Sequence, residues 1–208
     1  MIKIALLDTK QGNLVKVGDE GELNVVVHPH PPKEDDTDIS PYVSDFLNSS
    51  DSNDFRVDGS TTNIDFFVNA DPVSDLHIKT ISVIIADAGA SLNEYGNLTA
   101  LTNGTQLIWQ TQDIGEVYIS SAIQTNLDFM RATACNPSFG TGQDAFKADL
   151  SGGGADAYLP VYDLSYIFGL QYGVKLRAGT KDKLIFRIRD NLSTGIDEHN
   201  AVAYGIKF

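Results

Sequence analysis

The clearest pattern along the chain is an alternation of apolar and polar residues in its last third. Apolar side chains occupy every second position in residues 172–176, 184–188 and 202–208. Successive side chains of a β-strand point to opposite faces of a sheet, so this period of two predicts strands with one buried apolar face. Residues 64–68 and 107–109 show the same alternation.

Residues 76–85 form the longest predicted strand, and its pattern changes phase. The apolar positions are even-numbered up to Ile78 and odd-numbered from Ile81 onward. A slip of one residue inside a strand is typical of a β-bulge, in which one strand carries an extra residue. The sequence therefore predicts a bulge near Lys79-Thr80.

Many short strands, separated by turn residues and without a regular strand–helix rhythm, favour an antiparallel β-sandwich of the jelly-roll type. We assign residues 63–208 to this all-β domain and expect it to fold without the residues that precede it. Leu127 and Phe129 continue the strand pattern. Asp163, followed by an apolar segment and Gly169, predicts a short capped helix.

Residues 1–32 predict an extended N-terminal arm with a β-hairpin. Two apolar runs flank Gly18-Asp19-Glu20-Gly21, whose Gly and Asp residues suit a hairpin turn. A hairpin alone is marginal in water, so we expect it to dock by adding strands to a partner. Packing against its own domain is the alternative. The predicted docking residues are Leu14, Val15, Val17, Leu23, Val25, Val26 and Val27.

Residues 33–62 predict an acidic tether between the arm and the domain. Two stretches in it are almost wholly polar and bury too little to favour an ordered core. Between them, Ser40-Pro41 has the composition of a helix N-cap and first turn. Three apolar residues within 43–47 follow at helical spacing, so the sequence predicts one short helix that docks by its apolar face.

Charge narrows the possible partners. The chain has 208 residues and a net charge of −13, and its lysines and arginines form no cluster. A surface that binds phosphates needs such a cluster, so we expect no nucleic-acid partner. Residues 1–100 carry 17 acidic and six basic side chains, which we interpret as a solvated surface, with a basic partner as the alternative. No apolar run reaches 18 residues and no signal peptide is evident, so we expect no membrane partner.

The motifs give no indication of catalysis or of a cofactor. No G-x-S-x-G motif occurs, and Cys135 has no sequence cue that pairs it with a base. His28 and His30 have the spacing of some metal ligands but lie in a proline-rich segment, where we expect exposed linker histidines. The carboxylates between Asp190 and Glu198 leave the question of a calcium site open. We expect a protein that is not an enzyme, with no cofactor or metal.

Two parts of the chain resemble known proteins. The stretch LRAGTKDKLIFRIRDNLS at 176–193 and the closing AVAYGIKF resemble the last strands of small jelly-roll virion proteins of tailed bacteriophages. The segment QGNLVKVGDEGELNVVVHPHPP at 11–32 is similar to the arms by which such proteins attach to a capsid or tail. The resemblance implies a capsid accessory protein (a decoration or head-fibre base protein) located in the virion. It also implies a homotrimer whose partner is the major capsid protein or another virion protein.

The outward faces of the predicted strands carry two apolar residues, Phe67 and Ile185, which we expect to be covered by contacts between copies. A carbohydrate-binding module or a receptor-binding tail component is the alternative function, and an enzyme on a β scaffold is a third. A carbohydrate site would need exposed aromatic side chains. The candidates are Trp109, Tyr95, Tyr158 and Tyr162.

Overall fold

The computed structural model describes residues 16–17, 23–24, 39–88, 91–133, 147–149 and 155–208. The chain divides into two compact units, Met1–Asp38 and Ile39–Phe208. In the first unit β1 (Lys16–Val17) pairs antiparallel with β2 (Leu23–Asn24), as the predicted hairpin requires. The pair places Val17 opposite Leu23. The other five predicted docking residues, Leu14, Val15, Val25, Val26 and Val27, lie outside the described residues.

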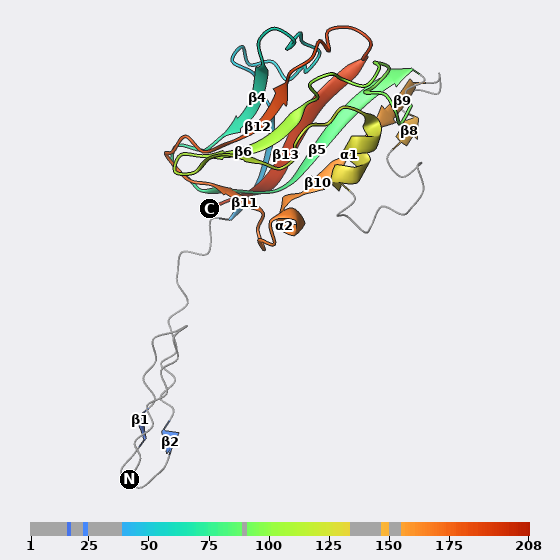
Figure 1. The fold of residues 1–208 in the computed structure, drawn as a ribbon. Helices are drawn as coiled ribbons and strands as arrows, with labels where there is room; N and C mark the ends of the chain where they lie inside the picture. The colour runs from blue at the N-terminus through green and yellow to red at the C-terminus, as the bar shows by residue number, and fades with distance from the viewer. Residues whose placement is uncertain (1–15, 18–22, 25–38, 89–90, 134–146, 150–154) are drawn as a thin grey trace. The chain divides into compact units, whose positions relative to one another are not determined.

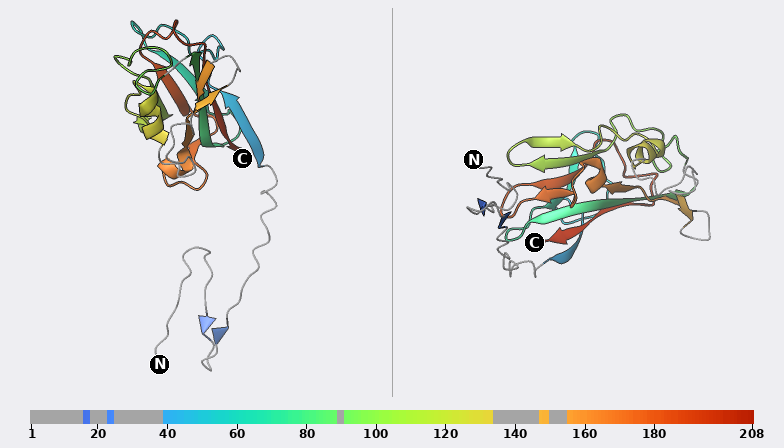
Figure 2. Two further views of the ribbon diagram at one scale, coloured as in Figure 1. Left: turned by 90° about the vertical axis from the view of Figure 1, so that its right-hand side faces the viewer. Right: turned by 90° about the horizontal axis from the view of Figure 1, so that it is seen from below.

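The second unit is an all-β sandwich of two antiparallel sheets, as predicted (Figure 1). The large sheet has the order β3-β13-β5-β9-β8, and β10 and β11 also pair with β5; the small sheet has the order β4-β12-β6-β7. Seen from below in Figure 2, the sheets form separate layers. The strands of the large sheet are β3 (Ser40–Asp45), β5 (Leu76–Ala88), β8 (Lys147–Asp149), β9 (Ala155–Tyr158), β10 (Val161–Asp163), β11 (Val174–Leu176) and β13 (Glu198–Lys207). Those of the small sheet are β4 (Ile64–Asn69), β6 (Gln106–Thr111), β7 (Gly115–Tyr118) and β12 (Lys183–Ile188).

The core lies between the sheets and follows the predicted alternation. Phe66 of β4 and Phe186 of β12 are fully buried and meet Phe55, which lies in the loop before β4. The ring centroid of Phe55 is 4.2 Å from that of Phe66 and 4.9 Å from that of Phe186. Burying one such ring contributes about 2 kcal/mol, so this cluster is a main source of stability.

The β5 bulge is confirmed. Tyr204 of β13 pairs with Thr80, but the next residue, Gly205, pairs with Ile78, so Lys79 is the extra residue of β5. The apolar side chains of β5 on both sides of Lys79 therefore all point into the core, although their positions in the sequence change phase.

Two glycines make room for the bulge. A Cβ at Gly205 would overlap the carbonyl oxygen of His77, and a Cβ at Gly173 would overlap that of Ile78. Gly173 also has a φ of +77°, which L residues rarely adopt. The backbone thus approaches β5 closely from both neighbouring strands.

The short helix predicted within residues 40–47 is wrong. This segment is β3, an edge strand of the large sheet that pairs with β13 from Ser40 to Asp45. An edge strand tolerates Pro41, because its missing N–H can face away from the ladder. The N–H of Phe46 donates to Ala201 at 3.1 Å, and its ring is fully buried. Pairing with a strand distant in sequence outweighs the local helical spacing.

This correction moves the domain boundary. The compact unit begins at Ile39, whereas the predicted domain began at residue 63. Part of the predicted acidic tether therefore belongs to the sandwich and supplies buried aromatic residues.

The helices are few and short. α2 (Leu164–Ile167) is confirmed: Asp163 Oδ1 accepts a hydrogen bond from the Ser165 N–H at 3.0 Å, and Gly169 follows with a φ of +61°. The strand predicted around Leu127 is wrong, because these residues lie in α1 (Asn126–Thr133). There the Thr125 hydroxyl accepts a hydrogen bond from the Asp128 N–H, which caps the helix.

We predict that residues 39–208 fold alone and that residues 63–208 do not. The shorter fragment lacks β3 and the buried rings of Phe46 and Phe55. Loss of two buried phenylalanines costs about 6–10 kcal/mol, which is comparable to the whole stability of a domain. Thermal unfolding followed by circular dichroism checks this. A cooperative transition in the 63–208 fragment would contradict the boundary at Ile39.

We also predict that Gly205→Ala lowers the free energy of unfolding by about 3 kcal/mol, because the methyl group overlaps β5 backbone at the bulge. Gly115→Ala is the matched control. Gly115, unlike Gly205, has a positive φ, but it has open space around it, so its substitution should cost only about 1 kcal/mol, from backbone strain. Urea unfolding measures both values. Equal losses of stability in the two variants would show that the close approach of the backbone at Gly205 does not exclude a side chain.

Candidate functional site: a hollow at the β5 bulge

A histidine with its hydrogen bonds satisfied lies inside the sandwich. His199 of β13 is 1% exposed. Its Nδ1 lies 2.9 Å from the carbonyl oxygen of Ile84, which can only accept, so Nδ1 carries the proton. Nε2 then accepts from the Tyr95 hydroxyl at 2.7 Å. Burial lowers the pKa of His199 to about 4, so the ring is neutral at neutral pH.

Two buried aspartates hold loops rather than forming a reactive pair. Asp190 accepts hydrogen bonds from the backbone N–H groups of Thr102, Asn103 and Gly104, at 2.7–3.2 Å. Asp182 does the same for the N–H of Gln112. The oxygens of Asp190 that a calcium ion would need are therefore occupied by backbone donors.

Asp182 is also paired with Arg177. The Nε of Arg177 lies 2.8 Å from Asp182 Oδ2, and the guanidinium also binds Asp113. Hydrogen bonds from Arg177 hold the pKa of Asp182 well below its usual range, against the opposing effect of burial. This arrangement fastens the β6–β7 turn to the β11–β12 loop.

The prediction that Ile185 contacts another copy is wrong. Ile185 is 0% exposed within a single chain. The next outward residue of β12 is Arg187, whose Nε lies 2.7 Å from Asp65 and whose Nη2 lies 2.9 Å from Glu116. Those carboxylates come from β4 and β7, the two edges of the small sheet, so the guanidinium crosses the face on which Ile185 lies. Within the sheet Ile185 pairs with Phe67 and Ile108, and the ion pairs of Arg187 lie on the same face.

Phe67, the other predicted contact residue, is half-buried. The ammonium group of Lys183 lies 5.3 Å from the centroid of its ring, within the range of a cation–π contact.

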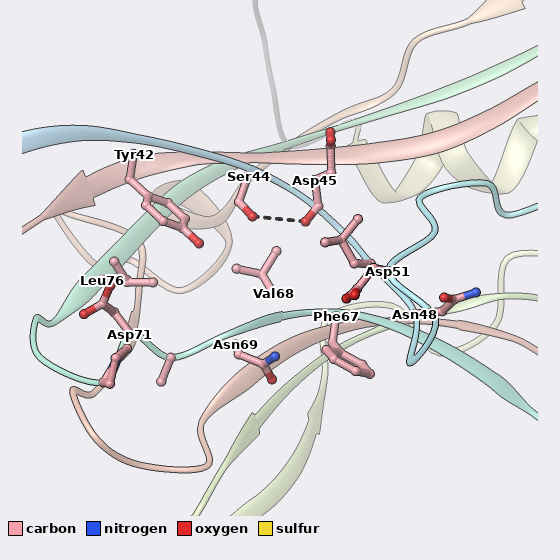
Figure 3. A pocket seen from close by; sticks show the side chains of 13 residues that line it. Tyr42, Ser44, Asp45, Asn48, Asp51, Phe67, Val68, Asn69, Asp71 and Leu76 are labelled. Carbon is pink, nitrogen blue, oxygen red and sulfur yellow. Dashed lines mark hydrogen bonds between the residues drawn. The ribbon is translucent and has the colours of Figure 1, made fainter.

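Phe67 also lines a cleft of about 300 Å³ between the edge strands β3 and β4, which we call the edge cleft (Figure 3). Val68 lies at its centre. The carboxylate of Asp71 at its rim binds Lys207 at 2.7 Å, and this hydrogen bond is the main reason that its pKa falls to about 2. The lining residues are Tyr42, Ser44, Asp45, Leu47, Asn48, Asp51, Phe67, Val68, Asn69, Ala70, Asp71, Pro72 and Leu76.

A larger cavity, of about 530 Å³, lies on the outer face of the large sheet at the β5 bulge, and we call it the bulge hollow. The strands β5 and β13 and the segment before β11 form it. Its volume is in the range of small-molecule sites, about 300–1,000 Å³. Its lining residues are His77, Lys79, Thr80, Gln171, Tyr172, Tyr204, Gly205 and Ile206.

The bulge hollow is lined by the face of β13 that the sequence predicts to be buried. Tyr204 and Phe208 are exposed, whereas Ala201 and Ala203, on the opposite face, are fully buried. Small alanines suffice on the inner face because large side chains from the rest of the core fill the space opposite them. The apolar stripe of β13 therefore faces solvent.

The aromatic residues that the sequence suggested for a carbohydrate site do not form one. Tyr95 and Tyr162 are buried, and Trp109 is half-buried against Phe168, with 5.4 Å between ring centroids. The side chain of Tyr158 lies outside the described residues. Tyr172 and Tyr204 are exposed instead. In the sequence each tyrosine directly precedes a glycine, Gly173 or Gly205, but the alternation assigned both tyrosines to buried faces.

The remaining candidates for chemistry are not placed. His28, His30 and Cys135 lie outside the described residues. Within the described ranges, no three His, Cys, Asp or Glu side chains gather in a way that could hold a metal ion.

We predict that the folded state loses about 2 kcal/mol of stability between about pH 7 and pH 5 because of His199. Its folded pKa, about 4, lies below its unfolded value of 6.5, so in this window only the unfolded chain takes up the proton. Stability is thus retained above the unfolded pKa and falls as the pH drops. Carboxylates with lowered pKa values, such as that of Asp71, lose stability only at lower pH.

Urea unfolding at a series of pH values measures this slope. The variant His199→Gln should be less stable at neutral pH but should show a much smaller loss on acidification. His77→Gln, which replaces a partly buried histidine, is the control and should keep most of the slope. A slope that persists in His199→Gln would show that other groups cause it.

Comparison of the chain with protein-family models, with curated proteins and with solved structures found no match. Among the described residues, no helix has both the length and the apolar composition needed to cross a membrane.

Proposed function

We propose that this chain is a non-enzymatic structural protein of a tailed-bacteriophage virion. In this proposal its N-terminal unit attaches it to the capsid, as a decoration or head-fibre base protein, and the sandwich is displayed. The observation that carries the proposal is the division of the chain into a 38-residue unit with a strand pair and a separate β-sandwich. The use of Asp182, Asp190 and Arg187 to fasten loops and strands also favours a structural role.

The strand order supports a jelly roll. Along the chain, β3, β5 and β13 belong to the large sheet, and β4, β6 and β12 to the small one. β13 lies between β3 and β5, and β12 lies between β4 and β6. Interleaved orders of this kind result when a long hairpin folds over as two Greek keys.

The strand pair of the first unit supports attachment by strand addition. Each strand has two residues, and Val17 pairs with Leu23. So short a ladder gains little by itself, whereas a partner sheet can complete the unpaired edges. In this proposal the partner is the major capsid protein or another virion protein, and the protein acts as a homotrimer. Burial of Ile185 removes one of the two residues on which the trimer interface was predicted.

We predict that the full-length double variant Val17→Asp/Leu23→Asp no longer co-sediments with virions assembled without this protein. The charges make a docked strand pair costly to bury, while they leave the residues of the sandwich unchanged. Thermal unfolding should therefore stay as in the original protein. The control is Val73→Asp, which places one such charge at an exposed position of the sandwich and should leave co-sedimentation unchanged.

Two results would contradict attachment through the N-terminal unit. One is co-sedimentation that survives the double substitution. The other is a drop of several kcal/mol in the stability of the sandwich, which would indicate that the arm packs on its own domain.

A further inference from the structure

The bulge hollow is built by the backbone rather than by a chance gap between side chains. Lys79 is the extra residue of β5, and Lys79 and Thr80 both line the hollow. Gly205 and Gly173 allow the neighbouring backbone to close on β5 at this point. Bulges are common next to binding sites because they redirect side chains out of the regular pleat.

Two tyrosines stand exposed at this hollow. Tyr172 is 48% exposed and Tyr204 39% exposed. Tyr172 makes edge contacts with two aromatic rings: its ring centroid lies 6.0 Å from that of His77 and 6.3 Å from that of Phe208. Side chains positioned in this way present ring faces without a large entropy cost on binding.

The polar groups of the hollow are available for hydrogen bonds. Lys79 forms no ion pair with any described residue, and the side chains of Thr80 and Gln171 have no hydrogen bond to the rest of the described chain. By contrast, nearby Lys175 is paired with Asp75. The lining contains one lysine and no carboxylate, although the chain as a whole carries 28 acidic residues.

We propose that the bulge hollow is a binding site for a saccharide. Sugar rings have apolar faces that stack on tyrosine and a rim of hydroxyl groups that need donors and acceptors. Tyr172 and Tyr204 supply the first requirement, and Lys79, Thr80 and Gln171 the second. An apolar ligand would leave these polar groups without partners. Lys79 allows the site to accept sugars with a carboxylate or phosphate as well as neutral ones.

This site is independent of the proposed attachment through residues 16–24. The test uses the full-length protein on an array of bacterial surface polysaccharides together with neutral and acidic oligosaccharides. The original protein should bind at least one class of saccharide. The double variant Tyr172→Ala/Tyr204→Ala should bind it about tenfold more weakly, because the stacking faces are lost.

The matched control is Tyr118→Ala. Tyr118 is 52% exposed but lies on β7 in the small sheet, so its loss should leave binding unchanged. Lys79→Gln should weaken binding of acidic saccharides more than that of neutral ones. Thermal unfolding of each variant establishes that it is folded, and the single variants replace the double one if that does not fold.

Three results would overturn the proposal. The first is that no saccharide on the array is bound. The second is that binding survives in the double variant or falls equally in Tyr118→Ala. The third comes from sedimentation velocity: if the original protein is an oligomer, binds no saccharide, and becomes a monomer in the double variant, this face is an interface between copies.

Discussion

The extra residue at Lys79 is the constraint on which much of the large sheet depends. β5 has 13 residues and pairs with β13, β9, β10 and β11, so a change in its geometry must be accommodated on both sides. Gly205 does this in β13 and Gly173 does it before β11. The same distortion keeps Ile78 and Ile81 in the core and turns the residues between them outward. One inserted residue therefore determines both the packing of the inner face of the large sheet and the bulge hollow on its outer face.

Charge serves a different purpose in this fold. The acidic excess does not gather into a reactive group in the described sandwich; several carboxylates replace water around backbone donors instead. Asp190 holds one loop through three N–H groups, and Arg187 joins carboxylates from both edges of the small sheet. Such groups are costly to bury alone but well compensated here. They fix loops that contain little apolar material of their own.

The period of two predicted most of the sandwich because both sheets have one face in the core. It even located the bulge, since a slip in phase is visible in the sequence. It failed at β3, where three apolar residues also fit a helix and only pairing with β13 decides the outcome. It failed again at Ile185, which pairs with Phe67 of β4 and Ile108 of β6 and is fully buried within the single chain.

The orientation of β13 was ambiguous for a related reason. Its larger apolar residues indicated the inner face, yet the core has room only for Ala201 and Ala203. A sequence pattern gives the alternation of a strand, but not which of two moderately apolar faces is covered. The exposed tyrosines of the bulge hollow could therefore be identified only from the folded chain.

The position of β3 has a mechanical consequence. The covalent link between the two units enters the sandwich at Ile39, immediately before β3. Any tension between the units is thus carried first by the β3–β13 ladder, and then by the buried ring of Phe46. Ladder hydrogen bonds lie across the strands, so a pull along β3 loads all of them at once, whereas a sideways pull opens them one by one. The force needed to unfold the sandwich by pulling on Ile39 should consequently depend on the direction of the pull.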